Sequence, residues 1–207
     1  MSSYPVSLNL EDRKCVIIGG GIIAERKVVT LLEAGAVVRV VSPDLTDKLQ
    51  ELANHSLIEY IPSDYESHHL DSAFLVIAAT NIREVNKAVF DEAQQRGILV
   101  NVVDDPELCT FFAPAVVRRG DLTISVSTAG KSPSLSRRIR EQLEAIYGLE
   151  YSDFVELLGE IRAEVIEQHL DYNESARAFR EILNSEVLDM LAHGEYDKAK
   201  KRALQCF

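Results

Sequence analysis

The sequence predicts an α/β protein in which a parallel sheet covered by helices is followed by a β-hairpin and then by further helices. The first observation is a strand, a glycine-rich turn, a helix and a second strand between Lys14 and Val41, a span of about 30 residues typical of a βαβ unit. The second is the alternation of short apolar runs with amphipathic segments, which indicates strands buried on both faces of a sheet. The third is a change after Val103, where this alternation stops.

Five apolar runs predict the strands of the sheet, and they are Lys14–Ile18, Val37–Val41, Leu57–Ile61, Ala73–Ala79 and Ile98–Val103. Helical patterns separate the runs, and they cover Ala24–Ala34, Thr46–Ala53 and Val85–Arg96. Because strands and helices alternate, we expect residues 1–112 to form a doubly wound, Rossmann-like domain.

The remainder of the chain follows a different pattern. Two strand-like runs predict a hairpin outside the parallel sheet, and they are Phe111–Arg118 and Leu122–Thr128. Ser134 is a candidate N-cap for a helix that runs to about Ile146. Apolar residues at helical spacing continue from Tyr151 to the C-terminus. We therefore expect a central region over residues 113–150 and a helical C-terminal domain over residues 151–207.

Composition limits the class of protein. The 207 residues are 46% hydrophobic and 27% charged, which is typical of soluble globular chains and excludes disordered and collagen-like classes. No apolar run reaches the roughly 18–20 residues of a membrane helix, and Met1–Leu10 lacks the basic start and apolar core of a secretion signal. The three widely spaced cysteines suggest neither a disulfide framework nor a zinc site. A cytoplasmic location is expected.

The strongest local motif is Gly19-x-Gly21-x-x-Ala24, because it follows a strand and opens a helix. Gly19 permits a tight turn, Gly21 lets the backbone approach a pyrophosphate, and the small Ala24 side chain lets helix and strand pack closely. The helix N-terminus at Ile22 and Ile23 offers free N–H groups and a favourable dipole to that anion. The motif predicts a dinucleotide site, and the alternative is a glycine turn without a ligand.

The second strand ends in Ser42, Pro43 and Asp44, where dinucleotide-binding folds usually place an acid that binds the ribose 2′-hydroxyl. Asp44 or backbone groups are the candidates for this contact. The turn itself has no Arg or Lys to meet a 2′-phosphate, which favours NAD. Arg39 and Lys48 are near enough in sequence to keep NADP as the alternative.

Polar residues also follow the fourth and fifth strands, at Thr80 and at Asp104-Asp105. Ligands of open parallel sheets bind beyond the carboxyl ends of the strands. Two neighbouring side chains on an extended segment point in opposite directions, so we expect at most one of Asp104 and Asp105 to face the cleft. That carboxylate is a candidate general base or metal ligand, and the alternative is a turn carboxylate that caps backbone N–H groups.

Charge is distributed unevenly along the chain. The formal net charge of −11 argues against nucleic acid and anionic membranes as partners. Ala113–Arg140 reverses this balance, with six Lys and Arg against one Asp, and is either a solvated helix face or an anion site. The histidines show no metal-ligand spacing. We expect His68 and His69 in a surface loop and Cys15 in the core.

These residues resemble the precorrin-2 dehydrogenase module of siroheme synthases. The motifs that carry the resemblance span roughly the first 140 residues in the family's order. They are Pro5 and Leu8, Val16–Gly21, Ala24–Lys27, Leu32–Ala36, Ala78–Thr80, Val85-Asn86, Asn101–Asp104, Phe111, Pro114-Ala115, Arg118, Ile124–Thr128 and Gly130–Pro133.

The resemblance implies a homodimer with an NAD-binding domain, a central dimerisation region and a helical C-terminal domain. It implies NAD-dependent oxidation of precorrin-2 to sirohydrochlorin, and some members of the family also insert ferrous iron to make siroheme. Asp104 corresponds to the catalytic aspartate of the family. The implied cofactor contacts are Gly19, Gly21, Ile22, Ile23, Ala24, Ser42, Pro43, Asp44 and Thr80.

The substrate implied by the resemblance carries many carboxylates, and burying several of them requires matching hydrogen-bond donors. The basic stretch and the hydroxyl-rich loop before its helix offer such donors, with Lys131 and Arg137 as the first candidates. The full implied set is Ser127, Thr128, Gly130, Lys131, Ser132 and Arg137.

Two rival functions remain open at this point. In an NAD-responsive regulatory module without catalysis, an acid usually stands at the end of the second strand. The function of such a module requires neither Asp104 nor the basic hairpin that follows it. A dehydrogenase of small hydroxy acids requires a His or Lys acid–base partner near the cleft, and the sequence shows none there.

Overall fold

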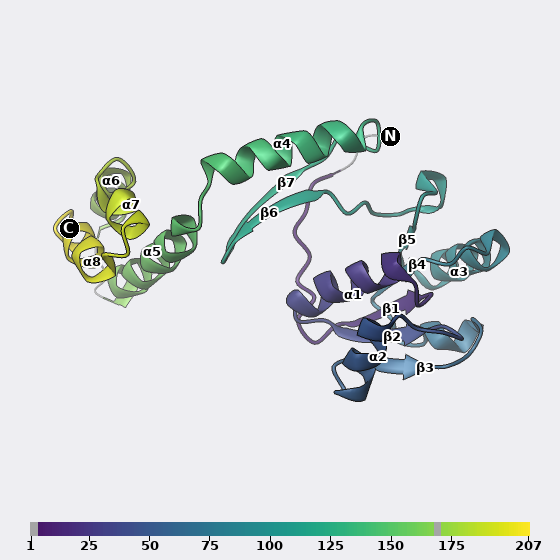
Figure 1. The fold of residues 1–207 in the computed structure, drawn as a ribbon. Helices are drawn as coiled ribbons and strands as arrows, with labels where there is room; N and C mark the ends of the chain where they lie inside the picture. Colours follow the sequence, from purple (N-terminus) through teal and green to yellow (C-terminus); the bar gives the residue numbers. More distant parts are fainter. Residues whose placement is uncertain (1–3, 168–170) are drawn as a thin grey trace. The chain divides into compact units, whose positions relative to one another are not determined.

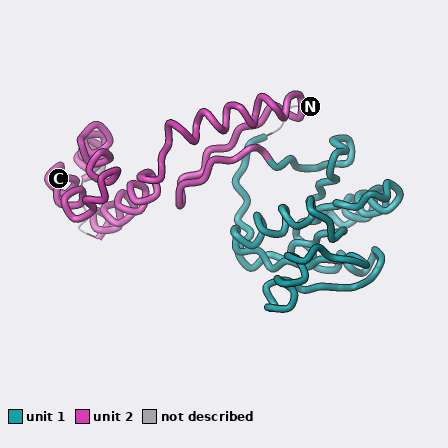
Figure 2. Tube along the Cα trace, in the orientation of Figure 1, with its two compact units in different colours: residues 1–113 teal, residues 114–207 magenta. Residues whose placement is uncertain are grey.

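The computed structural model describes residues 4–167 and 171–207, and Figure 1 draws their helices and strands. The chain divides into two compact units, Met1–Ala113 and Pro114–Phe207 (Figure 2). Within the described ranges, no helix is both long enough and apolar enough to cross a membrane. The further division of the second unit into a dimerisation region and a helical domain stays a prediction.

The first unit is built on a five-stranded sheet with the order β3-β2-β1-β4-β5 (Figure 1). The strands are β1 (Lys14–Ile18), β2 (Val37–Val41), β3 (Glu59–Ile61), β4 (Leu75–Ala78) and β5 (Leu99–Val102). All neighbouring strands run parallel, and Val16 of the central strand lies opposite Arg39 on one side and Val76 on the other. The predicted α/β class with an N-terminal parallel sheet is confirmed.

Helices cover both faces of the sheet, and they are α1 (Ile22–Glu33), α2 (Asp47–Asn54) and α3 (Arg83–Arg96). Successive residues of a strand point to opposite faces. Cys15 and Ile17 therefore pack in one core with α1 and α2, whereas Val16 and Ile18 pack in a second core with α3. Burial raises the pKa of the Cys15 thiol to about 11, which agrees with its predicted place in the core.

The connection from β3 to β4 contains a short 3₁₀ helix, η1 (Ser67–Leu70). His69 in this helix is only 2% exposed, so the expectation of a surface position is wrong for this residue. The backbone N–H of Glu66 donates a hydrogen bond to His69 Nδ1 at 3.0 Å. Burial, and next the neighbouring His68, lower the pKa of His69. His68 itself is exposed, as expected.

The second unit begins with the antiparallel pair β6 (Ala115–Arg119) and β7 (Leu122–Val126), which confirms the predicted hairpin. Helices follow, and they are α4 (Pro133–Ile146), α5 (Glu150–Glu167), α6 (Tyr172–Leu183), α7 (Val187–Ala192) and α8 (Tyr196–Leu204). A third core forms among α5 to α8, where Phe154, Leu157, Ile161 and Ile182 are buried.

Helix α4 begins earlier than the sequence suggests. Its N-cap is Ser132, whose Oγ accepts a hydrogen bond from the Leu135 N–H at 3.3 Å, so the expectation that Ser134 caps this helix is wrong. Pro133 fits the first helical position because its missing N–H would have no intrahelical partner there. The preference of proline for this position decides between the two serines.

Candidate functional site

A cavity of about 720 Å³ lies beyond the carboxyl ends of β1, β2, β3 and β4. Its size falls within the range of about 300–1,000 Å³ that is usual for ligand sites. It lies where the strand order reverses, since β2 and β3 are on one side of β1 and β4 and β5 on the other. Ligands of open α/β sheets bind at such a switch point. The predicted cofactor residues that line the cavity are Gly19, Gly21, Ile22, Ile23, Ser42, Pro43, Asp44 and Thr80.

The glycine turn between β1 and α1 forms the centre of the cavity wall. Gly19 has φ +117°, and a Cβ there would lie 2.5 Å from the carbonyl oxygen of Ala79 at the end of β4. Gly21 is the N-cap of α1, and a Cβ there would meet nothing within 4 Å. The first N–H groups of a helix have no intrahelical partner, so this open space suits a pyrophosphate. Ala24 does not line the cavity, because it is fully buried in the core between α1 and the sheet.

Gly20 is a requirement of the site that the sequence analysis missed. A Cβ at Gly20 would lie 2.0 Å from the carbonyl oxygen of Asp44, because the turn after β2 crosses directly over it. The Thr46 N–H also donates a hydrogen bond to the Gly20 carbonyl at 3.0 Å. The run of three consecutive glycines is the only signal in the sequence that pointed to this close approach.

The turn after β2 is held from the neighbouring strand. The Ser42 N–H donates to the Ile61 carbonyl at 3.2 Å, and the Tyr60 hydroxyl donates to the Pro43 carbonyl at 3.1 Å. Asp44 remains exposed on the rim of the cavity, and within the described part of the chain its carboxylate has no hydrogen-bond partner. The carboxylate is therefore available to a ribose hydroxyl.

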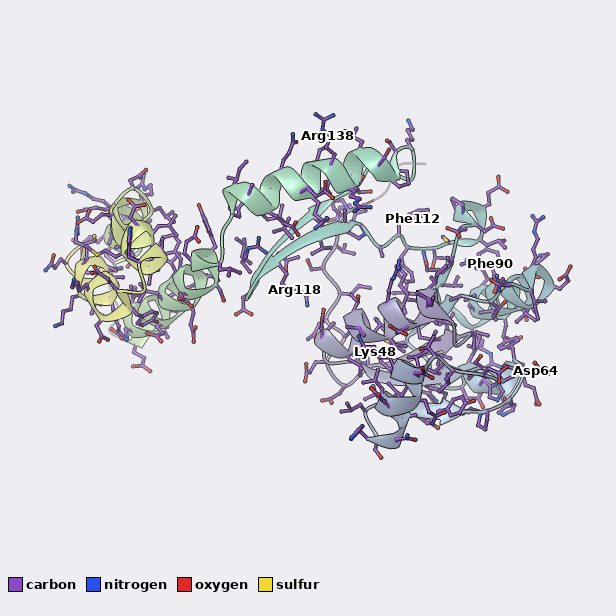
Figure 3. All side chains as sticks on the ribbon, viewed as in Figure 1. Lys48, Asp64, Phe90, Phe112, Arg118 and Arg138 are labelled. Carbon is purple, nitrogen blue, oxygen red and sulfur yellow. The ribbon has the colours of Figure 1, made fainter. Side chains whose placement is uncertain are left out.

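The two cations that left NADP open do not line the cavity. Arg39 forms a bidentate ion pair with Glu59 at 2.7 and 2.8 Å. Lys48 is exposed on α2, and Figure 3 shows it well separated from Asp64, which does line the cavity. Of the residues that the structure describes, no Lys, Arg or His lines this cavity, whereas Asp44 and Asp64 do. Such a wall disfavours a 2′-phosphate by like-charge repulsion.

A side-chain contact joins α1 to α2 at the edge of the cavity. The Thr46 hydroxyl donates to Glu25 Oε2 at 2.7 Å. As the N-cap of α2, Thr46 Oγ1 also accepts a hydrogen bond from the Leu49 N–H at 3.3 Å. Thr46 lines the cavity. This contact therefore holds the turn after β2 in place next to the glycines.

Thr80 lines the cavity at the end of β4, but its polar groups are used within the protein. Its hydroxyl lies 2.8 Å from Asn86 Oδ1 and accepts from the Ile82 N–H at 3.1 Å. The Asn86 amide donates to the Thr80 carbonyl at 2.9 Å, and Asn86 is only 8% exposed. Thr80 and Asn86 thus shape the cavity wall at the start of α3.

Asp104 and Asp105 follow β5 and differ in conformation and environment. Asp104 is exposed with φ +61°, so the segment is not extended and the expected alternation of directions does not apply. Asp105 belongs to the turn of η2 (Pro106–Leu108), where its carbonyl accepts from the Leu108 N–H at 3.1 Å and from the Cys109 thiol at 3.2 Å. Neither carboxylate lines the cavity. In the described part of the chain, the Asp104 carboxylate has no hydrogen-bond partner and is open to solvent.

The predicted substrate residues belong to the second unit, mostly in the loop between β7 and α4. Ala129 and Gly130 turn this loop with φ +51° and +78°. Thr128 Oγ1 accepts from the Ser132 N–H at 3.0 Å, and Ser127 Oγ accepts from the Ala129 N–H at 3.2 Å. The hydroxyl groups therefore hold the loop in shape. The Ser132 hydroxyl lies 3.4 Å from the Ser134 hydroxyl, whereas Ser127 Oγ is used only as an acceptor, so its proton is available for donation to an anion.

The cations of the basic stretch divide into paired and exposed groups. Arg119 donates to two main-chain carbonyls at the end of α4, at 2.8 and 3.2 Å. Arg137 and Arg140 form ion pairs with glutamates of the same helix. Lys131 and Arg138 (labelled in Figure 3) are exposed, and the described residues provide neither with an ion-pair partner. Of the two first candidates, only Lys131 has its charge unpaired.

Over residues 4–167 and 171–207, no group of three or more His, Cys, Asp or Glu side chains is placed to hold a metal ion.

The parallel sheet, the glycine turn and the cavity at the switch point define a dinucleotide-binding protein of the Rossmann type. The model of the family described as "Putative NAD(P)-binding" matches residues 6–115, and the chain belongs to this family. A second family, described as "Sirohaem biosynthesis protein central", matches residues 119–146, which contain β7 and α4.

Over 99% of its length the chain is similar to curated proteins named siroheme synthase. It is 40% identical over 205 residues to the one from Methylobacillus flagellatus and 35% identical over 204 residues to the one from Photobacterium profundum. The chain spans only 44% of the length of these relatives. Among solved structures it is similar to "SirC, precorrin-2 dehydrogenase", with a TM-score of 0.80 and 26% identity over 98% of this chain and 100% of that chain. The predicted family resemblance is confirmed.

Proposed function

We propose that this chain oxidises precorrin-2 to sirohydrochlorin with NAD as the oxidant. The observation that carries the proposal is the similarity to a precorrin-2 dehydrogenase over that protein's whole length, with a TM-score of 0.80. A dinucleotide cavity alone suits a regulatory module as well. The exposed carboxylate of Asp104 beyond β5 and the basic stretch Ala113–Arg140 favour the dehydrogenase over that module.

The residues around the cavity bind and orient the cofactor. When bound, NAD supplies the hydride acceptor. The N–H groups at the start of α1 hold the pyrophosphate above Gly21, where a side chain would obstruct it. Asp44 accepts hydrogen bonds from the ribose hydroxyls, and the lack of a cation among the described lining residues selects NAD over NADP.

Asp104 is the proposed general base. Forming sirohydrochlorin removes a hydride and a proton from the macrocycle, so a carboxylate must accept the proton while the hydride goes to the cofactor. The left-handed backbone at Asp104 presents its exposed side chain beyond the sheet edge. Asp105 is less suitable because its main chain is held in the η2 turn. The exposed Lys131, with Arg137 and the Ser127 hydroxyl, binds substrate carboxylates in this proposal, and Thr128, Gly130 and Ser132 shape the loop that carries them.

The hairpin supports a homodimer. β6 and β7 form a two-stranded sheet, and in the described part of the chain neither strand pairs with a third. An isolated two-stranded sheet is marginally stable, and its free edges favour pairing with another chain. Residues 113–150 are the proposed dimerisation region, and the molar mass measured by light scattering tests this. The three free cysteines suit the reducing cytoplasm as the site of action.

Insertion of ferrous iron into sirohydrochlorin is a second candidate activity. It is favoured by the similarity of 99% of this chain to proteins named siroheme synthase. Metal insertion displaces two pyrrole protons, and the exposed Asp104 carboxylate is suited to accept them in turn and pass each to solvent.

One pair of assays tests both activities. The protein is supplied with precorrin-2 and NAD, and the absorbance of sirohydrochlorin is followed; no colour change would refute the dehydrogenase proposal. Sirohydrochlorin is then supplied with ferrous or cobaltous ion without NAD. Failure of this second reaction refutes only the chelatase.

A further inference from the structure

The cavity continues beyond the ribose turn to the edge strand of the sheet. Ser63, Asp64 and Tyr65 follow β3 and form this part of its wall. In the proposed binding mode, the pyrophosphate lies at the end of β1 and the ribose at the end of β2. β3 is the next strand beyond β2 in the same direction. The adenine base of the dinucleotide therefore reaches the wall formed by these three residues.

Asp64 has the free polar group on this wall. The Ser63 hydroxyl donates to the Asp64 carbonyl at 3.0 Å, so it is already used. The Tyr65 hydroxyl is buried among apolar residues of the second core. The Asp64 side chain is exposed, and the described residues offer its carboxylate neither a hydrogen-bond donor nor an ion-pair partner. An ionised carboxylate only accepts hydrogen bonds, so its ligand must present a donor.

We propose that Asp64 reads the adenine base by accepting a hydrogen bond from its exocyclic 6-amino group. The inference rests on the proposed binding of NAD in this cavity. Asp44 is one strand nearer to the glycine turn and serves the ribose, so the two acids have separate roles. A purine with a 6-oxo group places an acceptor against the carboxylate, where an amino group would donate. Asp64 thereby selects adenine over a 6-oxopurine.

The test compares NADH with deamino-NADH, in which hypoxanthine replaces adenine, by calorimetric titration of the full chain. One charge-assisted hydrogen bond at an exposed site corresponds to about a tenfold difference in Kd, so the unaltered protein should bind deamino-NADH about tenfold more weakly. Asp64→Asn should reduce the ratio of the two Kd values to about one, because the amide can also donate to the 6-oxo group. Asp47→Asn is the matched control, since Asp47 is an exposed acid of α2 that does not line the cavity.

Each outcome bears on a separate claim. A tenfold preference for NADH that persists in Asp47→Asn and disappears in Asp64→Asn supports the assignment. Equal affinity of the unaltered protein for both dinucleotides, or an unchanged ratio in Asp64→Asn, overturns the role of Asp64 and leaves the proposed function standing. If neither dinucleotide binds the unaltered protein, the proposed use of NAD fails, and this inference fails with it.

Discussion

Alanine at Gly21 and alanine at Gly20 are expected to damage the protein in different ways, although the residues are neighbours. Gly21 has φ −83° and ψ −176°, which alanine adopts without strain, and the added Cβ meets no protein atom within 4 Å. The Cβ of Gly20→Ala would lie 2.0 Å from the Asp44 carbonyl oxygen, so the turn after β2 must move. The first change should therefore affect the ligand and the second the fold.

The magnitudes follow from these contacts. Gly21→Ala loses about 0.5 kcal/mol of helix capping, which lowers Tm by only about 1–2 °C. Its methyl group displaces the pyrophosphate, and the loss of one charge-assisted hydrogen bond weakens NADH binding roughly 10- to 100-fold. Gly20→Ala costs about 2–3 kcal/mol of steric strain and lowers Tm by roughly 5–10 °C.

The assay measures Tm by circular dichroism and the Kd of NADH by its fluorescence for the unaltered chain and both variants. Gly20→Ala is the control for folding, because its Tm shows the effect of a methyl group that does collide with the protein. Unchanged NADH affinity in Gly21→Ala would show that the pyrophosphate does not lie at this turn. A Tm for Gly20→Ala equal to that of the unaltered chain would contradict the close approach of Asp44.

Asp104→Asn should lower the rate of precorrin-2 oxidation about 100-fold or more with an unchanged Kd for NADH, and an unchanged rate would move the base elsewhere, first to Asp105. Thr46→Val removes the hydrogen bond to Glu25 and the N-cap of α2, so Tm should fall by roughly 3–6 °C. Thr46→Ser retains the hydroxyl and should retain most of the stability. Equal losses of Tm in both variants would contradict a role for the hydroxyl. Burial lowers the pKa of His69 below its ordinary value of 6.5, so below that pH the unfolded chain binds a proton that the folded chain resists, and the free energy of unfolding falls as the pH decreases. His69→Asn keeps an acceptor for the Glu66 N–H and should reduce the loss of Tm between pH 7.5 and pH 5.5, and an equal loss in both proteins would exclude His69 as its source.

Local pattern in the sequence was sufficient to locate the five strands and three α-helices of the first unit, although β3 and β4 are shorter than expected. β1 and β2 have the predicted bounds because each apolar run is limited by charged or turn residues, and a strand buried on both faces requires such a run. The glycine turn could also be predicted from the sequence, since Gly19 and Gly21 follow the first strand at the spacing that a pyrophosphate requires. Short-range chemistry therefore determined the class of fold and the central part of the candidate site.

Contacts between distant segments decided the rest. Gly20 must be glycine because the turn carrying Asp44 passes over it, and the run of three glycines does not tell which distant segment makes that approach. His69 is buried because η1 packs against α3, although the polar neighbours of His69 indicated a surface position. Asp64 joins the cavity wall only because β3 pairs beside β2, and strand pairing brings residues from four separate turns to the carboxyl ends of the strands. The sequence alone determines which segments form strands and turns, whereas strand order determines which of these segments meet, because pairing between strands is set by tertiary packing.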